Sequence, residues 1–361
     1  MKHIGNFKFA GVTRRGALRG LGSAGLTTAL AASPLQFAGK AWAQSAPRPG
    51  TITTALSWIP NHQFAGLWVG LDKGWFNDAG VRVEWRPGGP NTPNGVERVA
   101  SGEVSLGSQS GMRPVLEAIT KGNDLVVVGS RFQHVPGGML SLAKRPVLEA
   151  KDLIGKRLIL PSPTDVRTIE IALKLNKLPS TPNTFQYVPG GFDPQALVDG
   201  QGDAMLAFVT NQPVALEAKG MVKDKDFFFR TWDELGLPSY SGFLFGTRKW
   251  VAENRDLLVR YLRTEIRGWV MNEVNPAYAA KLVVDKYGAD FGLDLKREVR
   301  SNELQMPFLH SAETAKNGLF WVDRDRLGGA MYDGLRAGGL KRLPDIDKYL
   351  DMSLLRDARK A

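Results

Sequence analysis

Short apolar runs alternate along the chain, from residue 51 onward, with longer segments whose apolar residues recur at helical spacing. Residues 81–85 alternate strictly between apolar and charged side chains, which predicts a strand with one buried face. Residues 62–73 have helical spacing, and Gly74 follows them as a typical helix stop. This succession of strands and helices predicts an α/β fold in which mainly parallel sheets are flanked by helices.

The same patterns predict the remaining elements. Further strands are expected at residues 51–58, 104–106, 125–130, 139–143, 157–160, 185–188, 204–208, 227–230 and 243–246. Further helices are expected at residues 96–101, 113–121, 165–175, 194–199 and 253–271. The rest of the chain reads as a helical C-terminal tail.

The length of the chain favours two lobes over one core, because 361 residues exceed what a single compact core usually holds. We expect one lobe from residues 51–140 plus 247–361 and the other from residues 141–246. The chain would cross between them near residues 140–143 and 242–247.

The first 43 residues differ from the rest, with six basic and no acidic residues around a mildly apolar stretch that ends in Ala41-Trp42-Ala43. This pattern predicts a signal peptide cleaved near Ala43 and a periplasmic mature protein. Arg14 and Arg15 resemble the twin-arginine signal, although Ala17 stands where a bulky apolar residue is usual. An ordinary Sec signal is the alternative.

Charge and composition exclude several classes of protein. The net charge of +11 includes the six positive charges of the signal segment, which leaves +5 spread without a dense basic run, so we expect no nucleic-acid partner. The chain has no cysteine, so it relies on its cores rather than on disulfides. No phosphate-binding glycine motif follows a strand, and we expect no cofactor.

Ligands of open α/β sheets bind beyond the carboxyl ends of the strands, so the loops that follow strands are the candidate site. These loops contain amides, hydroxyls and aromatic faces, which suit a flat polar heterocycle that is stacked on a ring and hydrogen-bonded at its rim. The candidate ligand-binding residues are Trp58, Asn61, His62, Ser108, Gln109, Gln133, His134, Tyr187, Asn211 and Tyr240.

Structural roles compete with binding at three of these positions. Asn61 follows Pro60 and has the residue type of a helix cap. Asn211 precedes Gln212-Pro213 and has the position of an N-cap. His134 also fits as an ordinary loop residue.

Catalytic motifs are sparse, and we expect the protein not to be an enzyme. Residues 107–111 resemble a nucleophile elbow, but Gln109 stands at its centre instead of serine. Outside the signal segment, the histidines are His62, His134 and His310, without metal-ligand spacing. A secreted hydrolase is the alternative class, and it would need a nucleophile and a base that the sequence does not pair.

Four blocks of residues resemble the thiamine-pyrimidine-precursor binding family of ABC-importer substrate-binding proteins, which is related to nitrate- and alkanesulfonate-binding proteins. The blocks are residues 58–83 with Trp58-Ile59-Pro60-Asn61-His62 and Lys73-Gly74-Trp75-Phe76, residues 99–104, residues 199–204 with Thr210-Asn211-Gln212-Pro213, and Tyr240-Ser241-Gly242. The chain departs from the family at His62-Gln63-Phe64, where the histidine usually stands just before the Ala-Gly pair.

The resemblance implies a two-lobed periplasmic binding protein of the type II-like form, with two hinge crossings and a ligand in the cleft. It implies a monomer that delivers a small molecule to an ABC permease with a cytoplasmic ATPase. Trp58 would stack on the ligand. The implied hydrogen-bonding residues are Asn61, Ser108, Gln133, Tyr187 and Asn211.

The ligand implied by this resemblance is a pyrimidine precursor of thiamine. Riboflavin, a sulfonate, nitrate or an aromatic carboxylate are the alternatives within the class. An anion would need an arginine in the cleft, so Arg113, Arg131 and Arg167 are the positions that distinguish these ligands.

The tryptophans of the opening segment divide into two groups. Phe64, Trp68 and Leu71 recur at helical spacing and are predicted to pack on the sheet. Trp58 lies at the end of the first strand and is the predicted ligand contact.

Overall fold

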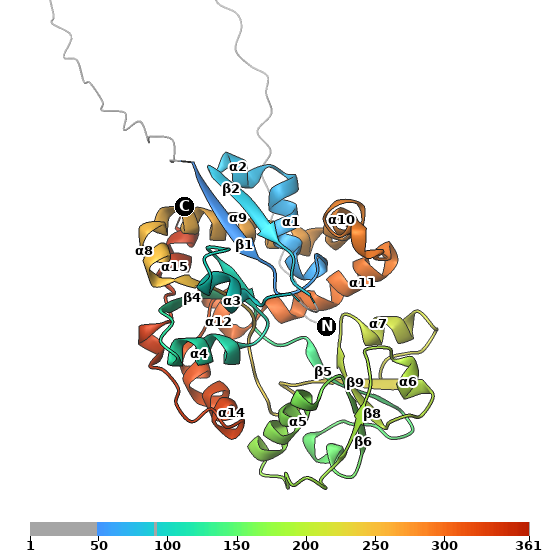
Figure 1. Cartoon of the computed structure of the whole chain (residues 1–361). Helices are drawn as coiled ribbons and strands as arrows, with labels where there is room; N and C mark the ends of the chain where they lie inside the picture. The colour runs from blue at the N-terminus through green and yellow to red at the C-terminus, as the bar shows by residue number, and fades with distance from the viewer. Residues whose placement is uncertain (1–48, 90–91, 361) are drawn as a thin grey trace, which may run out of the picture. The chain divides into compact units, whose positions relative to one another are not determined.

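The structure is a computed structural model that describes residues 49–89 and 92–360 (Figure 1). These residues belong to one unit, Pro47–Ala361. The predicted signal peptide at residues 1–43 lies outside the described residues.

The first set of strands combines a parallel pair with a three-stranded sheet. β1 (Gly50–Ala55) pairs in parallel with β2 (Val81–Arg86), and a bridge from Thr54 to Leu106 connects this pair to β3 (Gly107–Gln109). β3 and β4 (Leu125–Phe132) both pair with β10 (Ser241–Thr247), which lies between them. We call the part of the molecule built on these strands the first lobe.

The second sheet has five strands in the order β7-β6-β8-β5-β9. Their bounds are β5 Gly137–Leu142, β6 Arg157–Leu160, β7 Gln186–Pro189, β8 Ala204–Phe208 and β9 Phe227–Thr231. All come from one continuous stretch of chain, residues 137–231, which we call the second lobe.

One strand in each of the two larger sheets runs against its neighbours. β5 is antiparallel to β8 and β9, and β10 is antiparallel to β3 and β4. The chain enters the second sheet through β5 and returns to the first lobe through β10. Each of these two strands therefore runs away from the crossing between the lobes, and its neighbours run toward that crossing. The changes of sheet occur at residues 133–136 and 232–240, a few residues before the predicted crossing points. The sheets are therefore mixed, with four of the five strands of the second sheet running in one direction.

The helices cover the sheets (Figure 1). Those before β5 are α1 (Ala65–Asp72), α2 (Trp75–Asp78), α3 (Gly95–Ala100) and α4 (Met112–Thr120). The second lobe contains α5 (Pro163–Leu175), α6 (Gln195–Val198) and α7 (Gln212–Glu217). After β10 come α8 (Arg248–Glu253), α9 (Arg255–Val274), α10 (Pro276–Leu282), α11 (Leu295–Gln305), α12 (Ala312–Asn317), α13 (Arg324–Arg326), α14 (Tyr332–Ala337) and α15 (Ser353–Arg359).

The core of the first lobe confirms the predicted packing of the opening helix. Phe64 and Trp68 are fully buried, and Leu71 packs against the same core. The Trp68 indole donates a hydrogen bond to the carbonyl of Asn61 at 2.8 Å and stacks on Tyr287. Buried tryptophans need a partner for this donor, so Trp68 also fixes the loop before the helix.

Helix α1 lies unusually close to α9. A Cβ atom added to Gly268 of α9 would lie 1.9 Å from the carbonyl oxygen of Gly66 in α1. Only glycine permits this approach of two backbones. The long helix predicted at residues 253–271 is α9, which begins at Arg255 and is separated from α8 by Asn254. In the described part of the chain, no helix has both the length and the apolar character needed to cross a membrane.

Candidate functional site

A cavity of about 470 Å³ lies where the loops of both lobes meet the C-terminal helices. Aromatic and aliphatic side chains form much of its wall, and polar groups are distributed among them, as is typical of small-molecule sites. The first lobe contributes Trp58, Ile59, Asn61, His62, Gln63, Ser110, Phe132 and Ser241. The second contributes Phe208, Thr210, Asn211 and Phe192, with Pro136 from the crossing, and the segment around α11 contributes Gly292, Leu293, Asp294, Arg297, Glu298 and Ser301.

Trp58 stands in the loop after β1 with 39% of its surface exposed. The amide of Gly88 donates to the Trp58 carbonyl at 3.1 Å. A Cβ atom on Gly88 would lie 2.5 Å from the carbonyl oxygen of Leu56. The loop after β2 can therefore pack this closely against residues 56–58 only because residue 88 is glycine. The backbone of Trp58 is thereby held while its ring stays available to a ligand.

Asn61 has both of the roles considered for it. Its side chain accepts a hydrogen bond from the amide of Gln63 at 3.0 Å, which caps the short 3-10 turn His62–Phe64. Asn61 also lines the cavity. Capping therefore does not exclude contact with a ligand, because the amide nitrogen of the side chain is not used by the cap.

His62 is held on three sides by α11. The carboxylate oxygen Oε2 of Glu298 accepts from the His62 backbone amide at 3.2 Å and lies 2.9 Å from the ring Nδ1. Gln305 donates to the His62 carbonyl at 2.7 Å. Because a carboxylate only accepts, the His62 ring donates to Glu298 through Nδ1. Nε2 is buried and has no partner among the described residues.

Asn211 lies in the loop between β8 and α7. It occupies the N-cap position of α7, but its side chain makes no capping hydrogen bond. The buried side chain of Gln212 accepts from the Phe208 amide at 2.8 Å and donates to the Phe192 carbonyl at 3.1 Å. Gln212 thus fixes the loop and leaves the Asn211 amide directed to the cavity wall.

Helix α11 contacts both lobes at the cavity. Ser301 donates to the carbonyl of Thr210 at 2.6 Å, and Arg300 forms two hydrogen bonds with Glu217 of α7, at 2.8 and 3.1 Å. Figure 1 shows α11 close to the second lobe, near α7. The wall of the cavity is therefore continuous from His62 to Thr210.

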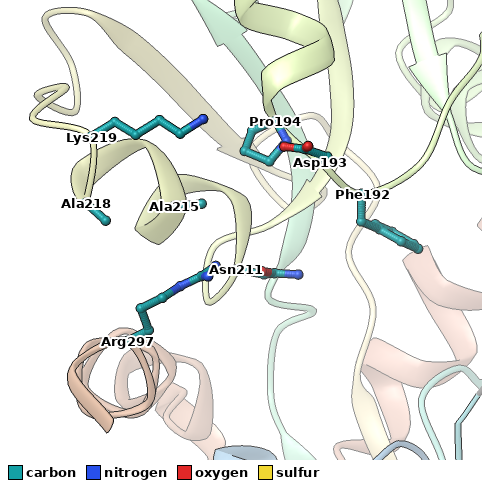
Figure 2. A pocket seen from close by; sticks show the side chains of 8 residues that line it. All are labelled: Phe192, Asp193, Pro194, Asn211, Ala215, Ala218, Lys219 and Arg297. Atoms are coloured by element: carbon teal, nitrogen blue, oxygen red, sulfur yellow. The ribbon is translucent and has the colours of Figure 1, made fainter. Parts of the chain in front are cut away.

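A side pocket of about 360 Å³ adjoins the cavity (Figure 2). Phe192, Asn211 and Arg297 line both spaces. The other residues of the side pocket are Asp193, Pro194, Ala215, Ala218 and Lys219. This pocket brings two cations, Lys219 and Arg297, together with the carboxylate of Asp193.

The family described as NMT1/THI5 like matches residues 61–279 of the chain, which is more than half of its length. The chain belongs to the NMT1/THI5-like family.

Two curated relatives of this NMT1/THI5-like protein are binding proteins. The riboflavin-binding protein RibY of Chloroflexus aurantiacus is 26% identical over 301 residues, which cover 81% of this chain and 82% of that protein. A formylaminopyrimidine-binding protein of Halalkalibacterium halodurans is 23% identical over 290 residues, which cover 76% of this chain and 84% of that protein.

A solved structure confirms the predicted fold class. The ligand-binding component of an ABC-type import system from Staphylococcus aureus has a TM-score of 0.60 at 13% identity, and the match covers 86% of this chain and 99% of that chain. The NMT1/THI5-like protein thus has the fold of a substrate-binding component, and it belongs to a family of such components.

Four of the ten predicted ligand-binding residues line the cavity, namely Trp58, Asn61, His62 and Asn211. The other six lie elsewhere. Ser108 is fully buried in β3 and accepts from Arg131 at 2.8 Å, while half-buried Gln109 pairs with Phe243 of β10. The next residue, Ser110, reaches the cavity in their place.

Gln133 and Tyr240 join the crossings to the C-terminal segment. The side chain of Gln133 donates to the Trp321 carbonyl and accepts from Ser311, both at 2.9 Å. The buried hydroxyl of Tyr240 accepts from the Asp323 amide at 3.0 Å, and burial raises the pKa of this hydroxyl. Neither residue lines the cavity.

His134 and Tyr187 also lie away from the cavity wall. His134 is hydrogen-bonded to Asp233 through Nδ1, and Arg326 contacts the same carboxylate at 3.2 Å. Tyr187 in β7 packs against a hydrophobic core of the second lobe. Arg326 of α13 also donates to the Gln133 carbonyl, so it bonds to both crossings between the lobes.

Arginine stands in the cavity at a position that the sequence did not indicate. Arg113 bonds to Glu117 and to the Gly338 carbonyl, Arg167 is exposed elsewhere, and Arg131 is buried against Glu265 with 2.5 Å between Nε and Oε1. Burial alone would lower the pKa of Arg131, but the carboxylate of Glu265 raises it above its ordinary value. Among the described residues, Arg297 is the arginine that lines the cavity.

The described histidines pair with carboxylates. His62, His134 and His310 contact Glu298, Asp233 and Glu273 respectively, and none is hydrogen-bonded to a serine hydroxyl in the described part of the chain. Across residues 49–89 and 92–360, no group of three or more metal-binding side chains is close enough to hold an ion.

Proposed function

We propose that this protein is the periplasmic binding component of an ABC importer and that it captures a flat nitrogen heterocycle in the cavity. The exposed Trp58 in a wall that mixes aromatic and polar side chains carries the proposal. Aromatic faces bind flat rings by offset stacking, which adds about 0.5–1.5 kcal/mol to the burial of apolar surface. Membership of a family of substrate-binding proteins and a matching fold support transport over catalysis.

The polar residues around Trp58 supply the directional bonds that a heterocycle needs. We propose contacts from Asn61, His62 and Asn211, each of which lines the cavity. Amide side chains such as those of Asn61 and Asn211 offer donors and acceptors together. Ring nitrogens and exocyclic amines require this mixture of donors and acceptors.

Two ligands have support from different observations. A pyrimidine precursor of thiamine is supported by the sequence blocks and by the formylaminopyrimidine-binding relative. Riboflavin is supported by the second relative and by the size of the cavity, which is in the range that encloses drug-sized molecules rather than single rings. Sulfonate, nitrate and aromatic carboxylate depend on Arg297 alone as the cavity's arginine.

Tryptophan fluorescence tests the proposal directly. The mature protein is titrated with hydroxymethylpyrimidine, its formylamino relative, riboflavin and an alkanesulfonate, and quenching of tryptophan fluorescence reports binding. We expect a saturable response to a heterocycle and none to the alkanesulfonate. A response to the alkanesulfonate alone would refute heterocycle capture. Mass spectrometry of the molecule that co-purifies with the protein is an independent readout.

The cellular side of the proposal needs separate tests. A monomer in the periplasm would deliver the ligand to a membrane permease driven by a cytoplasmic ATPase. Fractionation of cells that express the full chain should place the processed protein in the periplasmic fraction, and substitution of Arg14 and Arg15 by lysine should block this export if the twin-arginine route is used.

A further inference from the structure

We infer that the ligand carries a hydroxylated side chain and that the side pocket of Figure 2 binds this chain. The inference rests on the proposed capture of a ring in the main cavity. It assigns the ligand to the class of heterocycles with a polyhydroxylated tail, to which riboflavin belongs and a simple pyrimidine does not.

The cavity and the side pocket form one continuous site. Phe192, Asn211 and Arg297 line both the cavity and the side pocket, so these residues stand at the passage between them. Figure 2 shows the Phe192 ring on the opposite side of the pocket from Lys219. A ring stacked on Trp58 can therefore extend a flexible tail past Phe192 toward the charged groups.

The side pocket contains both hydrogen-bond donors and acceptors. The guanidinium of Arg297 has no partner among the described residues, and the Asn211 side chain makes no capping bond. Lys219 donates to Gln195 at 2.5 Å, and one oxygen of Asp193 accepts from the Gln195 amide at 2.9 Å. Donors and acceptors are thus present together, and each has hydrogen-bonding capacity left.

A hydroxyl group fits this mixture better than an anion or an alkyl chain does. Hydroxyls donate and accept, so they can bond to Asp193 as well as to Arg297 and Lys219. A phosphate or sulfonate only accepts, so it could bond to Arg297 and Lys219 but not to Asp193, whose carboxylate would repel it. An alkyl chain would remove water from these charges without replacing its hydrogen bonds, which is costly.

Three flavins separate these possibilities because they share the isoalloxazine ring. Lumiflavin has a methyl group in place of the chain, riboflavin has a polyhydroxylated chain, and flavin mononucleotide ends the same chain in a phosphate. Binding to the mature protein is measured by quenching of tryptophan fluorescence. We expect riboflavin to bind at least about tenfold tighter than lumiflavin, since even one hydrogen bond to a charged group accounts for such a factor.

Substitutions locate the effect in the side pocket. Lys219→Gln and Asp193→Ala should each weaken riboflavin about tenfold and leave lumiflavin unchanged, because both residues line the side pocket and not the cavity. Lys296→Gln is the matched control, because Lys296 is an exposed lysine of α11 that lines neither space. Circular dichroism confirms that each variant is folded.

Each contrary result has a distinct meaning. Equal affinity for lumiflavin and riboflavin, or equal loss of both in the variants, would overturn the hydroxylated tail while heterocycle capture stands. Tighter binding of flavin mononucleotide than of riboflavin would replace it with an anion subsite. Binding of hydroxymethylpyrimidine without either flavin would also overturn it, and binding of no heterocycle at all would overturn the proposed function itself.

Discussion

A single carboxylate oxygen of Glu298 accepts hydrogen bonds from both the backbone amide and the ring Nδ1 of His62. The two residues are 236 positions apart in the chain, and both line the cavity. The contact joins the loop after the first strand to a C-terminal helix that also bonds to the second lobe through Ser301. The shape of the cavity consequently depends on α11 as much as on the strand-end loops.

Glu298→Ala should lower the free energy of unfolding by about 2–3 kcal/mol, because it removes a charged acceptor from two buried donors. It should also weaken ligand binding, since the His62 ring loses the partner that orients it. Urea denaturation and fluorescence titration measure the two effects. Glu298→Gln, which keeps an acceptor of the same shape, should lose less on both scales. Equal losses of stability and of ligand affinity in the two variants would show that a neutral acceptor of the same shape cannot replace the charge of the Glu298 carboxylate.

Trp58→Ala should abolish ligand binding and leave the melting temperature nearly unchanged, because the ring is well exposed and outside the core. Trp68→Ala is the matched control. Its indole is fully buried, so its removal should cost about 3–5 kcal/mol of stability. Thermal unfolding monitored by circular dichroism compares them. A large loss of stability in Trp58→Ala would assign that ring to packing instead of binding.

Arg131→Met should destabilise the protein by about 3–5 kcal/mol, because Glu265 would remain buried as an uncompensated charge. The double variant Arg131→Met with Glu265→Leu should recover much of this loss, since it removes both charges. Urea denaturation of the three proteins forms a thermodynamic comparison. Ligand affinity of the double variant should stay close to that of the parent, as neither residue lines the cavity.

Stability should fall at acid pH through Asp203 in the second lobe. Burial raises the pKa of this carboxyl, but hydrogen bonds from the Arg157 side chain and backbone, with the charge of Arg145, bring it below its ordinary value. A lowered pKa in the folded state means that the stabilisation is complete above the unfolded pKa of about 4 and is lost as the pH falls through the folded value. Asp203→Asn should therefore be less stable at pH 7 and lose less stability on acidification. An unchanged slope of stability against pH below 4 would contradict this assignment.

Much of the fold could be predicted from local patterns. The strands at residues 157–160 and 204–208 and the helix stop at Gly74 agree with the structure, because apolar periodicity and glycine conformation depend on neighbouring residues only. The position of β10 between β3 and β4 could not be predicted in this way. Pairing of strands so distant in sequence leaves no periodic signal.

The site residues likewise divide into those that local patterns predict and those that depend on tertiary packing. Trp58 and Asn211 follow strands, and the rule for open sheets led to them. Gln133 and Tyr240 have equally suitable side chains, but they bond to Trp321, Ser311 and Asp323 of the C-terminal segment, which no local pattern connects to them. Arg297 was missed for the opposite reason. It lies on a C-terminal helix whose resemblance to the family was only general, and its place in the cavity arises from tertiary packing.

The central position of β10 also determines the order in which the molecule can be completed. The second sheet is made from one continuous stretch, residues 137–231, so its contacts are available as soon as that stretch exists. The three-stranded sheet lacks its central strand, β10, until residues 241–247 have been synthesised. Strand edges left open in this way are prone to pairing with other chains. A chain that ends between β9 and β10 would therefore have all five strands of the second sheet but open edges on β3 and β4, and these edges are covered only when residues 241–247 follow.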